Sequence, residues 1–219
     1  MEHPSAHRLG ALAWLLVPIY FVAEAIGVAA IAMTGSAPYS LVDNVISDLG
    51  AATCTSIPYP YGDTPVCSPA HLVVGIGFAL TGLLITAGAL ALGAAARPRL
   101  LGRAALVLWV IVGLACVGSA VPLDVNLTAH TLLSLPMVLQ GPALWCTAGS
   151  LRHTAPHLAR IGRILAAVTV IGSVAMLAVS ISGTWIGLWQ RLSVWPGYAW
   201  LGAIGLRLVR TRSPRGASG

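Results

Sequence analysis

The chain is 219 residues long, with 57% hydrophobic and 8% charged residues. A soluble domain carries about 25% charged residues, so this composition excludes an ordinary soluble protein. The net charge of +6 comes from arginines without any lysine, and they gather at the ends of apolar blocks, which is typical of membrane orientation rather than of a nucleic-acid-binding face.

Apolar blocks long enough to cross about 30 Å of hydrocarbon as helices recur along the chain. They are continuous rather than alternating, which excludes a β-barrel. We predict an all-α, polytopic membrane protein with one domain of six transmembrane helices over residues 1–210 and a disordered cytoplasmic tail over 211–219. The predicted spans are about Leu9–Met33, Ala70–Ala95, Ala104–Leu123, Thr128–Ser150, Ile164–Ile181 and Leu188–Leu208. Pro18, Pro136 and Pro196 fall inside them and predict kinks.

Arginines predict the orientation of these spans. They lie in the loop after the second span, in the loop after the fourth span and in the tail: Arg97, Arg99 and Arg103; Arg152, Arg160 and Arg163; and Arg207, Arg210, Arg212 and Arg215. The other loops hold none apart from Arg191, near the start of the last span. Since positively charged loops stay inside, we predict a multi-pass plasma-membrane protein with both termini in the cytoplasm.

The loop from Thr34 to Pro69 falls on the predicted outer side and is too long for a bare connector. Its apolar residues between Ser40 and Gly50 recur at helical spacing, and these two residues suit the ends of a helix. We therefore predict a short amphipathic helix at the outer membrane interface. Its polar face would carry Asn44, Ser47 and Asp48.

Two of the four cysteines, Cys54 and Cys67, lie in this same loop. An extracytoplasmic loop sits in an oxidising space, so we predict a disulfide between them, with free thiols or loose metal ligation as the alternatives. Cys116 and Cys146 fall within predicted spans, where we expect them to act as small apolar packing residues.

Ionisable side chains within membrane segments are costly to bury and usually functional. In the predicted topology all of them lie in the outer half of the membrane or at its outer surface: Glu24, Asp48, His71, Asp124, His130 and Arg191. The cytoplasmic half has only terminal arginines. If the chain has a working site, this clustering places it on the outer side.

Two interpretations of this cluster remain open. In the first, it forms a polar outer-leaflet pocket that binds a lipid or another small amphiphile. The pocket would comprise Asp48, Asp124, His130 and Arg191, with Glu24 at its floor and Asn44 and Ser47 beside them. In the second, the groups are structural: Arg191 pairs with Asp48, Asp124 or Glu24, and the histidines cap helix ends or sit among headgroups.

Other functions are weighed against amphiphile binding, and whether the chain is an enzyme stays open. One is a metal-assisted membrane hydrolase that uses Asp48, Asp124, His71 and His130, since Asp and His ligate zinc. Another is a proton-coupled transporter with Glu24 as the coupling acid. The sequence indicates no cofactor and no partner beyond membrane lipids and an amphiphilic ligand.

Three motifs together resemble a known family. They are Asn44-x-Ile46-Ser47-Asp48-Leu49-Gly50, Val121-Pro122-Leu123-Asp124 followed by His130, and Gly187-Leu188-Trp189-Gln190-Arg191 opening a last span that ends in Gly205-Leu206-Arg207. They resemble the bacterial and archaeal membrane family called domain of unknown function 998, which is similar in layout to six-helix proteins of the Frag1, DRAM and Sfk1 type, linked to lipid handling. The resemblance implies a fold and topology over nearly the whole chain, but no settled activity. It also implies a glutamate before the arginine, where this chain has Gln190.

Overall fold

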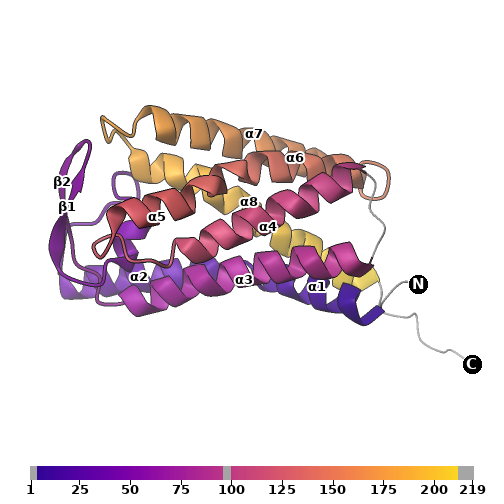
Figure 1. Cartoon of the computed structure of the whole chain (residues 1–219), viewed down its shortest axis with the longest axis horizontal. Coiled ribbons are helices and arrows are strands. Elements are labelled where there is room, and N and C mark those ends of the chain that lie inside the picture. Colours follow the sequence, from indigo (N-terminus) through magenta and orange to yellow (C-terminus); the bar gives the residue numbers. More distant parts are fainter. Residues whose placement is uncertain (1–3, 96–99, 212–219) are drawn as a thin grey trace, which may run out of the picture.

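The computed structural model describes residues 4–95 and 100–211, which form a helical bundle with a small sheet at one end (Figure 1). The helices are α1 (Pro4–Leu16), α2 (Ile19–Thr34), α3 (His71–Ala95), α4 (Leu100–Gly118), α5 (Leu127–Ser134), α6 (Gln140–Leu151), α7 (Pro156–Ala178) and α8 (Ile186–Thr211), with the 3-10 helices η1 (Ile46–Gly50) and η2 (Leu135–Leu139). The strands β1 (Thr55–Tyr59) and β2 (Gly62–Val66) pair as an antiparallel hairpin.

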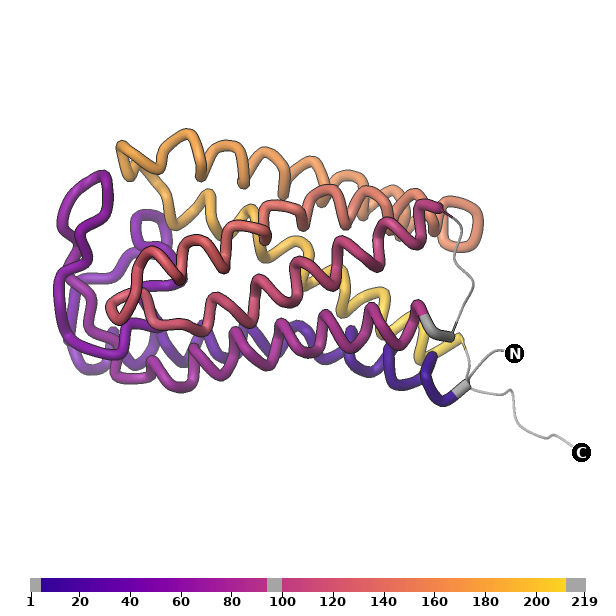
Figure 2. The backbone as a smooth tube through the Cα atoms, in the orientation of Figure 1, coloured from indigo at the N-terminus to yellow at the C-terminus, as the bar shows by residue number. Residues whose placement is uncertain are grey.

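The long helices form a closed ring. Neighbours pack in the order α1, α3, α4, α6, α7 and α8, and α8 packs back on α1. The start of α1 and the end of α8 lie at one end of the bundle, which we call the terminal end, and the β-hairpin lies at the other, the hairpin end (Figure 2). The consecutive helices α5, η2 and α6 together, and α8 alone, extend along the bundle beside the long helix α7 (Figure 1).

Aromatic residues fill the centre of the bundle. Tyr20 of α2 contacts Tyr198 of α8 and Phe78 of α3, with ring centroids 4.9 and 5.6 Å apart. Toward the terminal end, Trp14 and Trp109 meet edge to face, and each indole N–H donates a hydrogen bond, to the Ile85 carbonyl and to Thr147 Oγ1 respectively. Both of these buried indole N–H groups therefore have an acceptor, as a low-dielectric interior requires.

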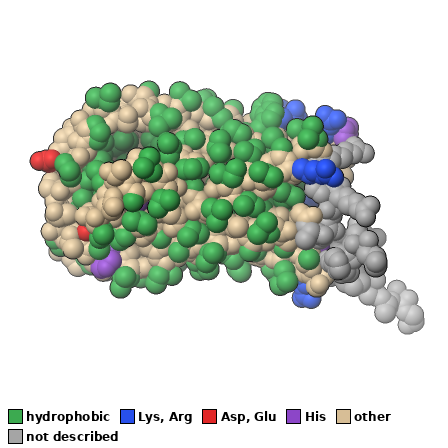
Figure 3. Space-filling model, viewed as in Figure 1, with side chains coloured by type: hydrophobic (Ala, Val, Ile, Leu, Met, Phe, Trp, Pro, Cys, Tyr) green, Lys and Arg blue, Asp and Glu red, His purple; other side chains and the backbone are tan. Residues whose placement is uncertain are grey.

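The outside of the bundle is apolar along most of its length (Figure 3). Within residues 4–95 and 100–211, four helical stretches are long and apolar enough to cross a membrane: Ser5–Thr34, His71–Gly93, Leu100–Gly118 and Pro156–Ala178. The predicted all-α membrane protein is therefore confirmed in its class.

Each of the three prolines marks a different local outcome. The first predicted span is interrupted at Pro18, between α1 and α2, and Pro136 lies in η2, so the fourth predicted span consists of three shorter helices. Pro196 lies inside a continuous α8. There the Gln140 amide donates to the carbonyls of Ser193 and Val194, just before the proline, as expected when a neighbouring helix satisfies carbonyls that a proline disturbs.

The predicted amphipathic α-helix over residues 40–50 is replaced by a turn followed by η1. The cause lies in α8. Its side chains take backbone groups that a regular helix would use itself: Arg191 binds the carbonyls of Leu41 and Asn44, and Gln190 accepts from the Ile46 N–H. The polar face that we expected at a membrane surface points inward, because Ser47 and Asp48 are buried.

The β-hairpin was not predicted from the sequence. Pro58 and Pro65 argue against strands, yet a two-stranded ribbon has only edges, where a missing N–H is tolerated. Ile57 and Val66 on one face pack against Leu123 of the α4–α5 connection. The predicted disulfide between Cys54 and Cys67 is confirmed and closes the hairpin at its base.

Part of the predicted arginine pattern lies outside the described residues, namely Arg97, Arg99, Arg212 and Arg215, together with the predicted tail beyond Thr211. Arg160 and Arg163, which we expected in a loop, belong to the first turns of α7, which begins at Pro156.

Candidate functional site

Arg191 of α8 is 2% exposed and holds several segments together at the hairpin end. Its Nε donates to Glu24 Oε1 at 3.0 Å. Its two Nη atoms donate, at 2.7–3.0 Å, to the carbonyls of Leu41, Asn44 and Gly187 and to the hydroxyl of Tyr39. One side chain therefore ties α8 to α2 and to the loop that leads into η1.

The second oxygen of the Glu24 carboxylate also accepts a hydrogen bond from α8. Trp195 donates from its indole N–H to Glu24 Oε2 at 2.8 Å, and the rings of Trp195 and Tyr39 lie 5.8 and 5.9 Å from the guanidinium carbon of Arg191. Among the partners that the sequence left open for Arg191, the structure selects Glu24. The pair is neutral as a unit and enclosed by aromatic rings.

Asp48 lies in η1 and is 2% exposed. The Asn44 amide donates to its Oδ2 at 3.0 Å, and the Tyr59 hydroxyl of β1 donates to its Oδ1 at 2.6 Å. Burial raises the pKa of Asp48, against the opposing effect of these two hydrogen bonds. Burial and the neighbouring carboxylate also raise the pKa of Tyr59, so the phenol remains a donor. Asp48 thus fastens the hairpin to η1.

Ser47, next to Asp48, meets His130 of α5 across the bundle. The distance from Ser47 Oγ to His130 Nε2 is 2.8 Å, and His130 Nδ1 lies 2.7 Å from the Val121 carbonyl. A carbonyl only accepts, so Nδ1 carries the proton of the neutral imidazole, and Nε2 accepts from the serine hydroxyl. The Ser47 hydroxyl therefore donates to His130 Nε2, and His130 Nδ1–H donates to the Val121 carbonyl.

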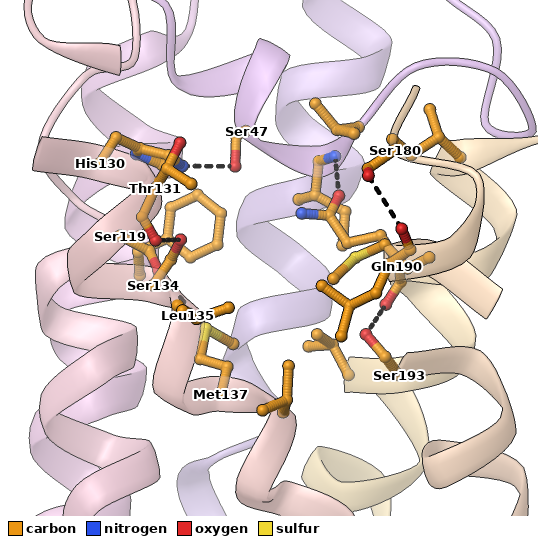
Figure 4. A pocket seen from close by; sticks show the side chains of 18 of the residues that line it. Ser47, Ser119, His130, Thr131, Ser134, Leu135, Met137, Ser180, Gln190 and Ser193 are labelled. Carbon is orange, nitrogen blue, oxygen red and sulfur yellow. Dashed lines mark hydrogen bonds between the residues drawn. The ribbon is translucent and has the colours of Figure 1, made fainter. Parts of the chain in front are cut away.

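Ser47 and His130 line a cavity of about 220 Å³, which we call the lateral cavity. Figure 4 shows side chains from η1, from α5–η2 and from α8 facing one another across it. Its polar lining includes Ser47, Ser119, His130, Thr131, Ser134 and Gln190, and its apolar lining includes Phe78, Leu135, Met137 and Leu177. Two residues of its lining, Leu135 of η2 and Leu177 of α7, are 47% and 49% exposed. The cavity therefore opens on the lateral surface of the bundle, between η2 and α7.

The remaining predicted site residues lie elsewhere. Asp124, in the α4–α5 connection, accepts hydrogen bonds from the N–H groups of Ala52 and Thr53 and from the Thr53 hydroxyl. His71 begins α3, with Nδ1 3.1 Å from the Ser68 carbonyl. Of the predicted binding residues, only Ser47 and His130 line the lateral cavity; Glu24, Asn44, Asp48, Asp124 and Arg191 do not.

A metal centre has no cluster of ligands to build on among the residues that the structure describes. No group of three or more His, Cys, Asp or Glu side chains comes together in 4–95 and 100–211. The acids and histidines that we considered as ligands for a metal-assisted hydrolase are instead engaged separately: Asp48 with Tyr59, Asp124 with Thr53, and His130 with Ser47.

Residues 17–207 match the family described as Protein of unknown function (DUF998). The chain belongs to this family. The resemblance predicted from its motifs is thereby confirmed, whereas the likeness in layout to Frag1, DRAM and Sfk1 proteins stays a prediction. No curated protein and no solved structure matches the chain. Membership of DUF998 thus supports a membrane fold and assigns no chemistry to this protein.

Sequence reasoning missed most of the polar lining of the lateral cavity in this DUF998 protein. Ser119, Thr131, Ser134 and Gln190 are uncharged, and small hydroxyl residues are common in membrane helices, so they do not stand out. One signal was present: His130, Thr131 and Ser134 recur at positions that share one face of a helix.

The substitution Arg191→Lys tests the role of the buried guanidinium. A lysine has a single nitrogen with three N–H donors and cannot reach Glu24, Tyr39 and the loop carbonyls together. Since disrupting a buried pair costs about 3–5 kcal/mol, we expect a large drop in the thermal unfolding midpoint of purified protein in detergent. The control is Arg207→Lys, because Arg207 is exposed and makes one bond, to the Thr154 carbonyl. Equal midpoints for both variants would contradict the proposed role.

The substitution Asp124→Asn tests the anchor of the hairpin base, and its effect should depend on pH. Burial acts to raise the pKa of Asp124, but the hydrogen bonds from Ala52 and Thr53 outweigh it and hold the pKa below its ordinary value. The carboxylate therefore stabilises the fold above its unfolded pKa of about 3.9, and this contribution is lost as pH falls through the lower folded value.

At pH 7 we expect Asp124→Asn to unfold with a free energy lower by about 1 kcal/mol. Below about pH 4 the difference from the unmodified protein should shrink. Thermal unfolding of both proteins across this pH range measures it. A difference that stays constant with pH would show that the charge of Asp124 has no part in the anchor.

Proposed function

We propose that this DUF998 protein crosses the plasma membrane six times, with the hairpin end outside the cell and both termini in the cytoplasm. We also propose that its lateral cavity binds the uncharged ester or alcohol end of a membrane amphiphile. The observation that carries the proposal is a cavity with polar side chains in an otherwise apolar wall, opening sideways between η2 and α7.

The length of the helices and the arrangement of charge support the topology. α8 has 26 residues and a length of about 39 Å at 1.5 Å per residue, enough to cross a bilayer with some tilt. Among the residues that the structure describes, the arginines other than Arg191 gather at the terminal end. On the face of the molecule shown in Figure 3, acidic side chains appear only at the hairpin end. Positive charge marks the cytoplasmic side.

The chemistry of the cavity favours an uncharged polar group in the ligand. Its lining holds hydroxyls, the Gln190 amide and the His130 imidazole, and no acidic side chain or arginine. The guanidinium of Arg191, which we expected to bind a headgroup, is already occupied by Glu24 and the loop carbonyls. A phosphate or carboxylate would lose its hydration without gaining a counter-charge, which is unfavourable in a cavity of this kind.

The size of the cavity favours one chain of an amphiphile. Whole small-molecule sites occupy roughly 300–1,000 Å³, and this cavity holds about 220 Å³. Only the polar end and the first part of a chain would fit. The rest of the chain would pass between Leu135 and Leu177 into the hydrocarbon, where it contacts lipid. A monoacylglycerol has this form.

Matched cysteine variants test the topology. Thr184 lies in the α7–α8 loop at the hairpin end and Thr154 in the α6–α7 loop at the terminal end, and both are exposed. We expect a membrane-impermeant maleimide to label Thr184→Cys in intact cells, and Thr154→Cys only after the cells are permeabilised. The opposite pattern, or equal labelling of both, would reject the proposed orientation.

A photoreactive monoacylglycerol tests the ligand site in the purified protein. We expect cross-links, located by mass spectrometry, on α5–η2 and on the facing parts of α7 and α8. Ser134→Phe, which fills the cavity, should reduce them by about tenfold, as a loss of about 1.4 kcal/mol of binding would. Ala167→Phe, in the apolar groove between α6 and α7, is the matched control and should leave them unchanged. Cross-links in that groove alone would refute the proposed site.

A further inference from the structure

We propose that Ser47 and His130 are a nucleophile and its base, and that they transfer the acyl group of an ester-linked amphiphile held in the lateral cavity. The inference rests on the proposed ligand site and adds a reaction to it. The sequence did not indicate this pair as a nucleophile and base, because the serine and the histidine are far apart in the chain and meet only in the fold.

The hydrogen bonds of the pair have the order that nucleophilic catalysis needs. The Ser47 hydroxyl donates to His130 Nε2 at 2.8 Å, and His130 Nδ1–H donates to the Val121 carbonyl at 2.7 Å. The carbonyl fixes the tautomer and the ring orientation, a role that a carboxylate fills in many hydrolases. Both side chains line the cavity, so an ester carbonyl bound there has access to the serine oxygen.

Surrounding contacts hold Ser47 in place. Its neighbours on both sides are tied down: the Ile46 N–H donates to Gln190 Oε1, and Asp48 accepts from Tyr59 and Asn44. On the other side of the pair, His130 belongs to the first turn of α5, which Asn126 caps by accepting from the Ala129 N–H. A nucleophile and a base on such supports keep their geometry without a ligand.

Gln190 supplies a donor for the negative charge that develops during acyl transfer. Its Oε1 accepts from the Ile46 N–H, which turns Nε2 away from that backbone. Nε2 has no partner within residues 4–95 and 100–211, and the side chain reaches from α8 into the cavity that Ser47 and His130 line (Figure 4). An amide N–H directed into such a cavity stabilises a tetrahedral oxyanion.

The reaction is balanced with groups on the chain and one water. Ser47 Oγ attacks the ester carbonyl carbon while its proton passes to His130 Nε2. The bond from that carbon to the alcohol oxygen breaks, and the alcohol leaves with the proton from Nε2. Water then attacks the acyl-serine, gives a proton to Nε2 and releases the fatty acid, after which Nε2 returns the proton to Ser47.

A hydrogen bond between Ser47 and His130 that only tied η1 to α5 would differ from a catalytic pair in its reactivity. A structural serine does not react with an electrophile faster than other buried serines, whereas an activated nucleophile is modified selectively.

An alkyl fluorophosphonate tests the inference on the full-length protein in detergent. Its phosphorus accepts the serine oxygen and fluoride leaves. We expect mass spectrometry to find the adduct on Ser47 in the unmodified protein. Ser47→Ala should abolish labelling, and His130→Gln, which keeps hydrogen-bonding capacity, should slow it by about 10²–10⁴-fold. Ser173→Ala, at a buried serine outside the cavity, is the control and should label at the unmodified rate.

Labelling of Ser47 in the unmodified protein is by itself the test of the inference, so a variant that fails to fold does not obscure the result. Absence of an adduct on Ser47, or an adduct on another serine, overturns the inference. The photoreactive monoacylglycerol, applied to the same preparation, separates the two proposals. Cross-links at the cavity without reaction at Ser47 leave amphiphile binding standing and reject acyl transfer, whereas the loss of both rejects the site as a whole.

Discussion

The buried guanidinium of Arg191 is the contact on which the hairpin end depends. Its N–H groups cannot be left unsatisfied in a dry interior, and the structure supplies their acceptors from Glu24, Tyr39 and the carbonyls of Leu41, Asn44 and Gly187. Two of these carbonyls come from the stretch that would otherwise continue as a helix into η1. The arginine therefore determines the path of the loop, and the path of the loop brings Ser47 to His130.

This arrangement separates the charged groups from the lateral cavity, the proposed ligand site. Glu24 and Arg191 neutralise each other behind aromatic rings, Asp48 fastens the β-hairpin through Tyr59, and Asp124 fastens the hairpin base through Thr53. The lateral cavity is left with hydroxyls, an amide and an imidazole. Charged groups support the walls of the cavity and uncharged groups line it, an arrangement that would suit the proposed ester end of an amphiphile better than a phosphate.

The membrane class, the family and the disulfide could be predicted from the sequence because each rests on a local pattern: long apolar blocks, three motifs and two cysteines in one loop. The path of residues 40–50 could not, since apolar spacing predicts a helix and the competing acceptors for Arg191 are about 150 residues away. The same reason hid the site. Ser47 and His130 are 83 positions apart, and nothing near either residue indicates the other. Intramembrane charge, the usual signal of function, here identified the supports of the site.

A structure of the protein grown from a lipid phase, at a resolution that shows ordered lipid chains, tests the central claim most directly. The account predicts one elongated density that enters between Leu135 and Leu177 and ends within hydrogen-bond distance of Ser47, His130 or Gln190. A lateral cavity closed by side chains, with ordered lipid only in the groove of α6 and α7 beside Trp145, would contradict it.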